Sequence, residues 1–178
     1  MQEIRARIEQ ARATFLKMKH LLVSRHLSIE LRLRIVRCYV FPVLLYGLES
    51  WTLKQDVIKK LEAFEMWTYR RMLRISWVEH ITNLQVLDRM SKQKEILNNI
   101  KIRKLQYLGH ISRNSKYQLL QLIIQGKIQG KRNIGRRTTS WLKNLREWYG
   151  VTSLQIFRAC ASKVKIASMV ANLLKKTA

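Results

Sequence analysis

A glycine-rich basic segment at residues 126–137 carries the residue types best suited to holding phosphate groups. It has five cations, three glycines and no acid in twelve residues. Glycine lets backbone amides come close to a phosphate, the Arg guanidinium matches two phosphate oxygens, and Lys supplies a compact charge. The alternative is a solvated basic loop without defined contacts. The predicted phosphate-binding cations of this segment are Lys127, Lys131, Arg132, Arg136 and Arg137.

A second group of predicted binding cations lies upstream, on or near the end of a long predicted helix: Lys101, Arg103, Lys104 and Arg113. A stripe of positive charge on a helix can follow a nucleic-acid backbone, but it can equally be the solvated side of an amphipathic helix. The same two interpretations apply to two further groups, Arg32, Arg34 and Arg37, and Arg70, Arg71 and Arg74. Trp141 could stack on a base, although its spacing from Leu145 favours a place in a helix core.

Catalytic and metal-binding groups are sparse. Two-metal phosphoryl transfer needs clustered carboxylates, whereas the sequence has two aspartates, Asp56 and Asp88, on separate predicted helices. It contains no Asp–Asp pair, serine-nucleophile elbow, Walker-type loop or Cys–His pair. The four histidines are scattered, and the two cysteines, Cys38 and Cys160, are too few for a disulfide framework and lack zinc spacing. We therefore expect no catalytic residue, no metal, no cofactor and no enzyme activity of its own.

The charge balance predicts a polyanionic partner. Thirty-five Lys and Arg residues face eleven acidic ones, which gives a net charge of +24 and a pI near 10.8. Such a surplus repels itself in a compact fold, and phosphate contacts relieve it while releasing counterions. Residues 1–90 hold 16 cations and 9 acids, and residues 91–178 hold 19 and 2. We expect RNA or DNA as the partner, bound mostly by the second half.

Other partners and locations are not expected. The longest uncharged run, residues 38–48, is too short for a membrane span. The charged N-terminus is unlike a secretory signal, and the few cysteines fit a reducing compartment. We expect a protein inside the cell, with the nucleus among the possible locations, and no small-molecule substrate. The oligomeric state is left open.

The apolar spacing predicts helices along the whole chain. Steps of three and four give a helix over residues 2–23, and Ser28 is expected to cap a second one that bends at Pro42. Capping-box patterns at Thr52 and Thr82 predict a third helix, with apolar positions over 57–75, and a short fourth.

The second half continues the pattern. A long helix follows Ser91 to about residue 113, another ends at Gly126, and the segment 126–137 is expected to be a loop. A helix over 139–149 ends at Gly150, and Ser153 is expected to cap the C-terminal helical region. All-α is therefore the predicted fold class.

The chain resembles the region just downstream of the polymerase palm in insect-type non-LTR retrotransposon proteins, the endonuclease–reverse transcriptases. The stretches that carry the resemblance are YGLESW (46–51), LEAFE (61–65) running into YRRML (69–73), RKLQYLGHI (103–111), and the segment 126–137 followed by SWL (140–142). Together with the opening helix they cover most of residues 1–150, in a fairly specific order and spacing.

The resemblance implies a reverse-transcriptase thumb, a helical element that lies on the template–primer duplex, near the N-terminus. It further implies a helical region beyond the thumb that grips element RNA or target DNA, with the catalytic palm and the endonuclease upstream and outside this sequence. We expect a thumb-like helical bundle at residues 1–90 and a basic helical nucleic-acid-binding region at 91–178.

The resulting interpretation is a retrotransposon fragment that binds RNA or DNA through phosphate contacts without polymerising. Such contacts position a strand but do not read its bases. Three alternatives stay open. The chain is a segment of an active RNA-directed DNA polymerase whose palm lies elsewhere, a helical protein-interaction module, or a decayed open reading frame. A large exposed apolar patch would favour the interaction module.

Overall fold

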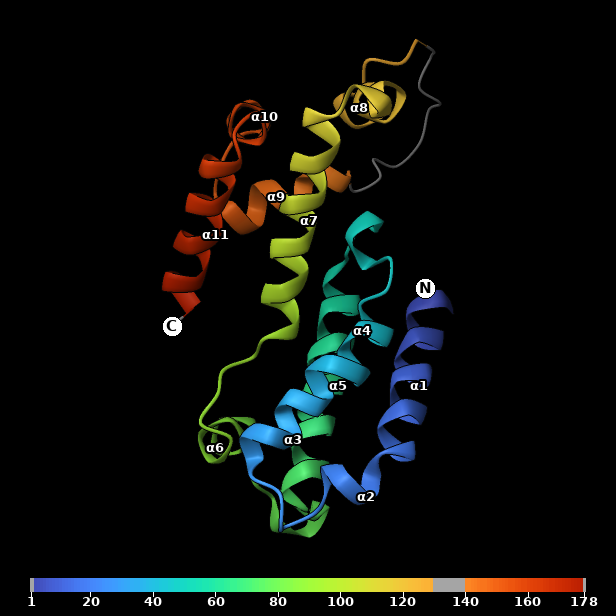
Figure 1. Cartoon of the computed structure of the whole chain (residues 1–178), viewed down its shortest axis with the longest axis vertical. Helices are drawn as coiled ribbons and strands as arrows, with labels where there is room; N and C mark the ends of the chain where they lie inside the picture. Colours follow the sequence, from blue (N-terminus) through green and yellow to red (C-terminus); the bar gives the residue numbers. More distant parts are fainter. Residues whose placement is uncertain (1, 130–139, 178) are drawn as a thin grey trace. The chain divides into compact units, whose positions relative to one another are not determined.

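The predicted all-α fold is confirmed. The structure, a computed structural model, describes residues 2–129 and 140–177, and every regular element in those ranges is helical (Figure 1). The chain divides into two compact units. The first unit comprises residues 1–47 and 55–97, and the second comprises residues 48–54 and 98–178. The sequence predicted a division near residue 90 but gave no signal that the short segment 48–54 belongs with the C-terminal half.

The first unit is a bundle of helices around one apolar core. Its helices are α1 (Gln2–Lys17), α2 (Lys19–Leu22), α3 (Ile29–Ile35), α4 (Phe41–Leu44), α5 (Gln55–Leu73) and α6 (Asn83–Arg89). The helix predicted over 2–23 divides at Met18, whose backbone leaves the helical conformation. The core residues of α1 and α5 follow the predicted helical spacing and include Ile4, Ile8, Ala11, Phe15, Val57, Leu61, Phe64 and Met72.

Two of the predicted helix starts in the first unit are confirmed. The Ser28 hydroxyl accepts a hydrogen bond from the Leu31 N–H at 3.2 Å and caps α3. Thr82 and Gln85 form the predicted capping box of α6. The box predicted at Thr52 is wrong, because α5 begins only at Gln55. The capping pattern was present, but Thr52 lies in the segment that packs with the second unit.

The bend expected at Pro42 begins one turn earlier. Residues Val36–Val40 form a wider, π-type turn, and Pro42 then lies in the first turn of α4. Proline has no N–H, so the first turn of a helix accommodates it where an interior position would not. A wide turn ahead of it lets the chain continue without a full break.

Helix α7 (Ile96–Arg113) begins later than the expected start after Ser91. Its N-terminus meets Glu65 of α5, which is fully buried and accepts the N–H of Glu95 at 2.6 Å and the hydroxyl of Tyr69 at 2.9 Å. A carboxylate is favourable there because the first N–H groups of a helix lack internal partners and carry partial positive charge. Burial raises the pKa of Glu65, while these hydrogen bonds act in the opposite direction.

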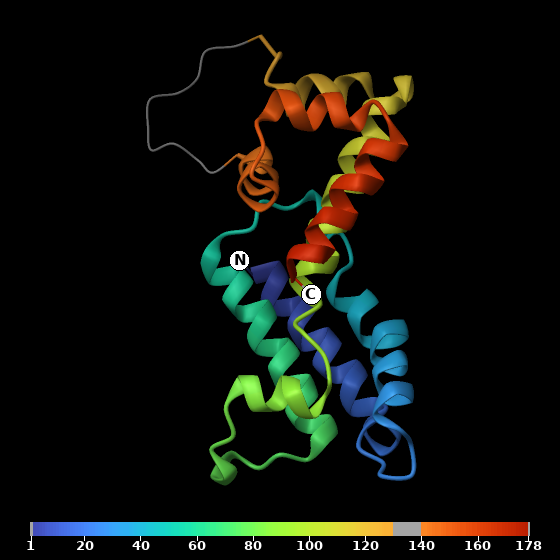
Figure 2. The same cartoon turned by 90° about the vertical axis from the view of Figure 1, so that its left-hand side faces the viewer.

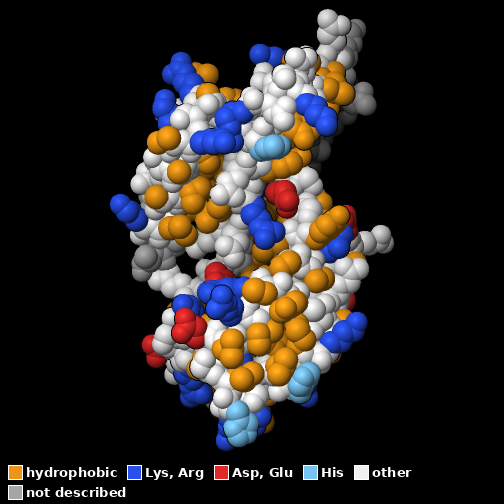
Figure 3. Space-filling model, in the orientation of Figure 1, with side chains coloured by type: hydrophobic (Ala, Val, Ile, Leu, Met, Phe, Trp, Pro, Cys, Tyr) orange, Lys and Arg blue, Asp and Glu red, His pale blue; other side chains and the backbone are white. Residues whose placement is uncertain are grey.

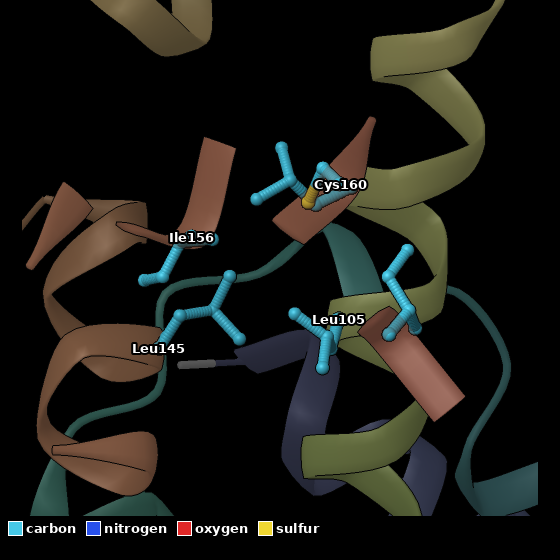
Figure 4. Close-up of a cluster of buried hydrophobic side chains, with 6 residues drawn as sticks. Leu105, Leu145, Ile156 and Cys160 are labelled. Carbon is cyan, nitrogen blue, oxygen red and sulfur yellow. The ribbon is translucent and has the colours of Figure 1, made fainter. Parts of the chain in front are cut away.

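The second unit packs helices around a compact apolar cluster. Beyond α7 its helices are α8 (Gln118–Gln125), α9 (Trp141–Tyr149), α10 (Ser153–Cys160) and α11 (Lys163–Thr177). Figure 4 shows the centre of this cluster, where Leu105, Leu145, Ile156 and Cys160 point toward one another from α7, α9 and α10. Because α7 is distant in sequence from α9 and α10, these contacts hold the unit together.

Two helices of the second unit end at the glycines that were predicted to end them. Gly126 and Gly150 adopt the left-handed conformation, with φ of 71° and 64°, and end α8 and α9. The start of α10 differs from the prediction, because Thr152 rather than Ser153 provides the cap and forms a capping box with Gln155. The predicted loop 126–137 lies mostly outside the described residues.

Helices α7 and α11 lie side by side (Figures 1 and 2). They approach closely at Gly109, where an added Cβ would come within 2.1 Å of Ile166 Cδ1. Glycine within a helix costs conformational entropy. At this position it provides the space that the α11 side chain needs.

Candidate nucleic-acid interface

The structure describes one of the five cations predicted in the segment 126–137. Lys127 is exposed and follows directly after Gly126, which ends α8. Its neighbours Lys131, Arg132, Arg136 and Arg137 lie outside the described residues. The proposed phosphate-binding role of this segment therefore stays a prediction.

The cations predicted on α7 do not form one surface stripe. Arg103 is exposed and Lys101 is half-buried. Arg113 is exposed, but one of its Nη atoms donates to the Cys160 carbonyl at 2.9 Å, so it also ties α7 to the end of α10. Lys104 is 0% exposed. Its burial removes Lys104 from the cations that a phosphate can reach, which corrects the prediction for this residue.

Lys104 is instead the centre of a buried polar contact set in the second unit. Its Nζ donates to the Trp51 carbonyl at 2.7 Å and to Asn144 Oδ1 at 3.0 Å. The same ammonium lies 4.6 Å from the ring centroid of Trp141 and 5.5 Å from that of Trp148, within the range of cation–π attraction. Burial lowers the pKa of Lys104 to about 7.

The contacts around Lys104 join three of the stretches that carry the family resemblance. Asn144 holds the segment 48–54 by accepting the Leu53 N–H and donating to the Leu53 carbonyl, both at 2.8 Å. Trp141 donates its indole N–H to the Glu49 carbonyl at 3.1 Å and packs against the apolar cluster. This confirms the core position favoured for Trp141. These residues stabilise the second unit.

The first unit contains a groove that the sequence did not predict. It has a volume of about 890 Å³ and lies between α1, α5 and the segment 75–83. We call it the basic groove, and its lining includes Lys19, Trp67, Arg70, Arg71, Arg74 and Trp77. The sequence left the three arginines open between a solvated face and a binding surface, because spacing on one helix cannot show that other segments build a hollow beside it.

The arginines of the basic groove hold its walls as well as supplying charge. Arg70 donates to the Ile81 carbonyl at 2.7 Å and to Asn83 Oδ1 at 2.9 Å. Arg74 donates through Nε to the Val23 carbonyl at 3.0 Å. These bonds join α5 and the residue that follows it to other segments. They fix where the guanidinium groups lie without neutralising them, because carbonyl and amide oxygens carry no net charge.

Aromatic side chains form the apolar part of the basic groove. Trp67 packs between Phe15 and Phe64, with ring centroids 5.1 and 5.7 Å away, and Arg71 lies over its ring at 5.6 Å. Trp77, on the short helical turn Trp77–Glu79, is 90% exposed. A fixed aromatic floor and an exposed indole beside several cations are typical of surfaces that bind unpaired nucleotides.

An exposed apolar surface also lies on the first unit. Apolar side chains gather over α3 and the following turn in Figure 3, and Leu31 and Tyr39 are among the exposed ones. This observation is of the kind that favours the protein-interaction alternative. The described side chains around this surface do not define a particular partner for it.

No group of three or more His, Cys, Asp or Glu side chains in the described ranges is arranged to hold a metal ion. None of the helices described has the length and apolar character to cross a bilayer. The absence of catalytic residues remains an expectation from the sequence.

Comparisons with known proteins give one informative match. No family model and no solved structure matches the chain. A Caenorhabditis elegans protein named as an uncharacterized transposon-derived protein is 27% identical over 125 residues. The match covers 66% of this chain and 44% of that protein, so the chain spans less than half of the relative's length. The similarity fits a transposon-related origin for the chain.

Proposed function

We propose that the chain binds RNA or DNA through phosphate contacts, as a fragment related to the post-palm part of a retrotransposon reverse transcriptase. The observation that carries this proposal is the charge balance. Even if each of the eleven acids neutralised one of the thirty-five cations, 24 cations would be left without a carboxylate partner. Phosphate groups supply the missing negative charge, and their condensed counterions are released on binding.

The proposal assigns two regions to the contact surface. The first is the segment 126–137, whose composition supports phosphate contacts. The second is the basic groove, where cations are held in place by hydrogen bonds to neutral groups. The similarity to a transposon-derived protein fits the retrotransposon-related origin in this proposal.

A salt titration tests the contribution of the segment 126–137. The variant replaces Lys127, Lys131, Arg132, Arg136 and Arg137 with alanine. Affinity for single-stranded RNA, duplex DNA and an RNA–DNA hybrid is measured over a range of NaCl concentrations. Each lost phosphate contact is expected to reduce the slope of log K against log salt by about 0.7 to 0.9, on unrelated sequences alike.

A control variant of equal charge separates contacts from bulk electrostatics. It replaces five exposed cations outside the segment and the basic groove: Arg5, Lys54, Lys59, Arg89 and Lys92. The control is expected to change the slope much less than the segment variant. Equal slopes for the two variants would remove the segment 126–137 from the interface.

Primer extension tests the polymerase alternative. The chain is expected to give no extended product on a primed RNA template with deoxynucleotides and Mg²⁺, because clustered carboxylates that could hold two metal ions are missing from its sequence. Extension by the purified chain would contradict that expectation and would place catalysis within these 178 residues.

A further inference from the structure

We propose that the basic groove of the first unit binds a single nucleic-acid strand, with an unpaired base stacked on Trp77 and phosphates held by Lys19, Arg71 and Arg74. This inference rests on the proposed nucleic-acid binding and assigns it a strand type and a site.

The lining of the basic groove has one sign of charge. None of the described residues that line it is acidic, and four of them are Lys or Arg. The ion pairs formed within the described part of the chain involve other cations. The positive charges near the C-terminus of α5 are stabilised by the dipole of that helix. This stabilisation does not explain why Lys19 of α2 also lines the groove.

A buried cation, Arg32, interacts with Arg74 of the groove lining. Arg32 is buried and donates to the carbonyls of Leu22 and Met72 at 3.4 and 2.7 Å. Burial, and then the charge of Arg74, lower the pKa of Arg32. An anion in the groove would offset this repulsion, because it would lie next to the Arg74 guanidinium. The groove is therefore complementary to phosphate.

The exposed indole of Trp77 favours a single strand over a duplex as the ligand of the groove. Its indole is 90% exposed although it lines the groove. Its turn is held by a capping box in which the Ser76 N–H donates to Glu79 Oε1 at 2.6 Å. The backbone of the turn is therefore held in place, and the indole offers an exposed apolar face beside the groove. Bases within a duplex stack on one another, so an unpaired strand is the form that can place a base on it.

The backbone that presents Trp77 is held in an unfavourable conformation. Arg74 and His80 have positive φ angles of 57° and 47°, a region that side chains other than glycine rarely adopt. They lie on either side of the turn that carries Trp77. Strain of this kind persists where the surrounding contacts fix the geometry, and it is concentrated at binding sites.

Substitution of Trp77 tests the inference in the full chain. The probes are fluorescein-labelled oligo(dT) and oligo(U), a duplex DNA of the same length, and poly-glutamate as an acidic polypeptide. Trp77→Ala is expected to weaken binding of the single strands about 5- to 150-fold, the range of one base stacked on an aromatic ring. Duplex binding is expected to change less than twofold.

Leu84→Ala is the matched control. Leu84 is 79% exposed, lies on α6 and does not line the groove. Its truncation removes a similarly exposed apolar side chain and is expected to leave the affinity for single strands and for duplex DNA unchanged.

The double variant Lys19→Ala, Arg71→Ala is expected to reduce the salt slope for single strands by about 0.7 per lost contact. Thermal melts of all variants are expected to match the parent, because the altered side chains are exposed.

The outcomes separate the inference from the proposed function. If the parent chain binds no polynucleotide in dilute buffer, the proposed function fails. If the parent binds but Trp77→Ala retains its full affinity for single strands, only the groove inference fails. Equal losses on single strands and duplex overturn the strand assignment. Tighter binding of poly-glutamate than of either oligonucleotide, lost in Trp77→Ala, would assign the groove to an acidic protein instead.

Discussion

Lys104 places a positive charge inside the second unit, where two neutral oxygens and two indole rings surround it. Removing an ammonium from water is unfavourable, and the hydrogen bonds and cation–π contacts offset part of that cost. The spacing of α7 contained a signal for this position. Ile96, Ile100, Lys104 and Leu108 follow one another at intervals of four, so Lys104 lies in the buried stripe of the helix.

The pH dependence of stability is expected to reflect Lys104. Burial lowers its pKa from 10.5 to about 7, so between these values the unfolded chain binds the proton and the folded chain does not. The free energy of unfolding therefore rises with pH from about 7 toward 10.5, by at most about 1.4 kcal/mol per pH unit from this group. Below pH 7 both states are protonated and the contribution is constant.

Urea unfolding of the parent and Lys104→Met at several pH values between 7 and 10 measures this effect. The substitution is expected to flatten the pH dependence, and the difference between the two proteins isolates Lys104 from other groups. Cys160 titrates in an overlapping range, since burial raises its pKa to about 11. A parent and variant with the same slope would show that Lys104 titrates normally in the fold.

Thiol labelling is expected to distinguish the two cysteines. Cys38 is exposed, whereas Cys160 is fully buried in the apolar cluster and its raised pKa keeps it protonated. Because the thiolate is the reactive form, iodoacetamide should modify Cys38 rapidly and Cys160 only after denaturation. Mass spectrometry of the labelled peptides measures this. Rapid labelling of both thiols in the native protein would contradict the described packing of α10.

At the scale of helices, contacts between distant elements set where some helices begin and how closely they pack. Ser28 and Thr82 cap the helices that directly follow them, so the local sequence predicts these helix starts. The start of α7 depends on Glu65, thirty residues away along the chain from Glu95. Local patterns cannot locate such a start, because the partner that satisfies the first N–H groups comes from another helix.

Glu65→Ala is expected to destabilise the first unit by roughly 2 to 4 kcal/mol. The change removes a buried acceptor that serves the Glu95 N–H at 2.6 Å and the Tyr69 hydroxyl at 2.9 Å, and leaves the hydroxyl only its longer bond to Glu95 Oε1 at 3.3 Å. Glu65→Gln keeps an acceptor oxygen and is expected to cost less. Chemical denaturation of the full chain measures both losses.

Glu62→Ala is the control on the same helix. Glu62 forms an ion pair with Lys94 at 3.0 Å and is partly exposed, so its loss is expected to cost less than about 1 kcal/mol. A cost for Glu62→Ala equal to that of Glu65→Ala would mean that the buried acceptor has no special role at the start of α7.

Gly109→Leu is expected to destabilise the second unit by roughly 1 to 3 kcal/mol, because the new side chain needs the space that Ile166 occupies. Combining it with Ile166→Ala removes the clashing atoms. The double variant is expected to be more stable than the sum of the two single losses predicts, as measured by denaturant unfolding. Additive losses would indicate that α7 and α11 do not approach closely at this position.

At the scale of the whole molecule, the net charge of +24 dominates behaviour in solution. Cations repel one another in the compact chain, and salt shortens the range of that repulsion from about 30 Å at 0.01 M to about 10 Å at 0.1 M. The chain is therefore expected to become more stable as salt rises, before any ligand is added.

Thermal or urea unfolding at increasing NaCl measures this effect. The unfolding midpoint is expected to rise over the first tenth of a molar and then level off. A single-stranded oligonucleotide at low salt is expected to raise it further, since a ligand that binds the folded state stabilises that state. A midpoint that falls with added salt would show that attractive ion pairs outweigh the repulsion.

The sequence by itself determined the all-α fold, several helix ends and the excess of positive charge. These properties are local or additive: Gly126 and Gly150 end helices through their own backbone freedom, and charges simply sum. Tertiary structure alone decided which groups accept the hydrogen bonds of the Lys104 ammonium and that Lys19 lines the same groove as Arg70, Arg71 and Arg74. The reason is physical: burial and hollows are set by which distant segments meet, and Lys104 finds its acceptors forty and fifty-three residues away.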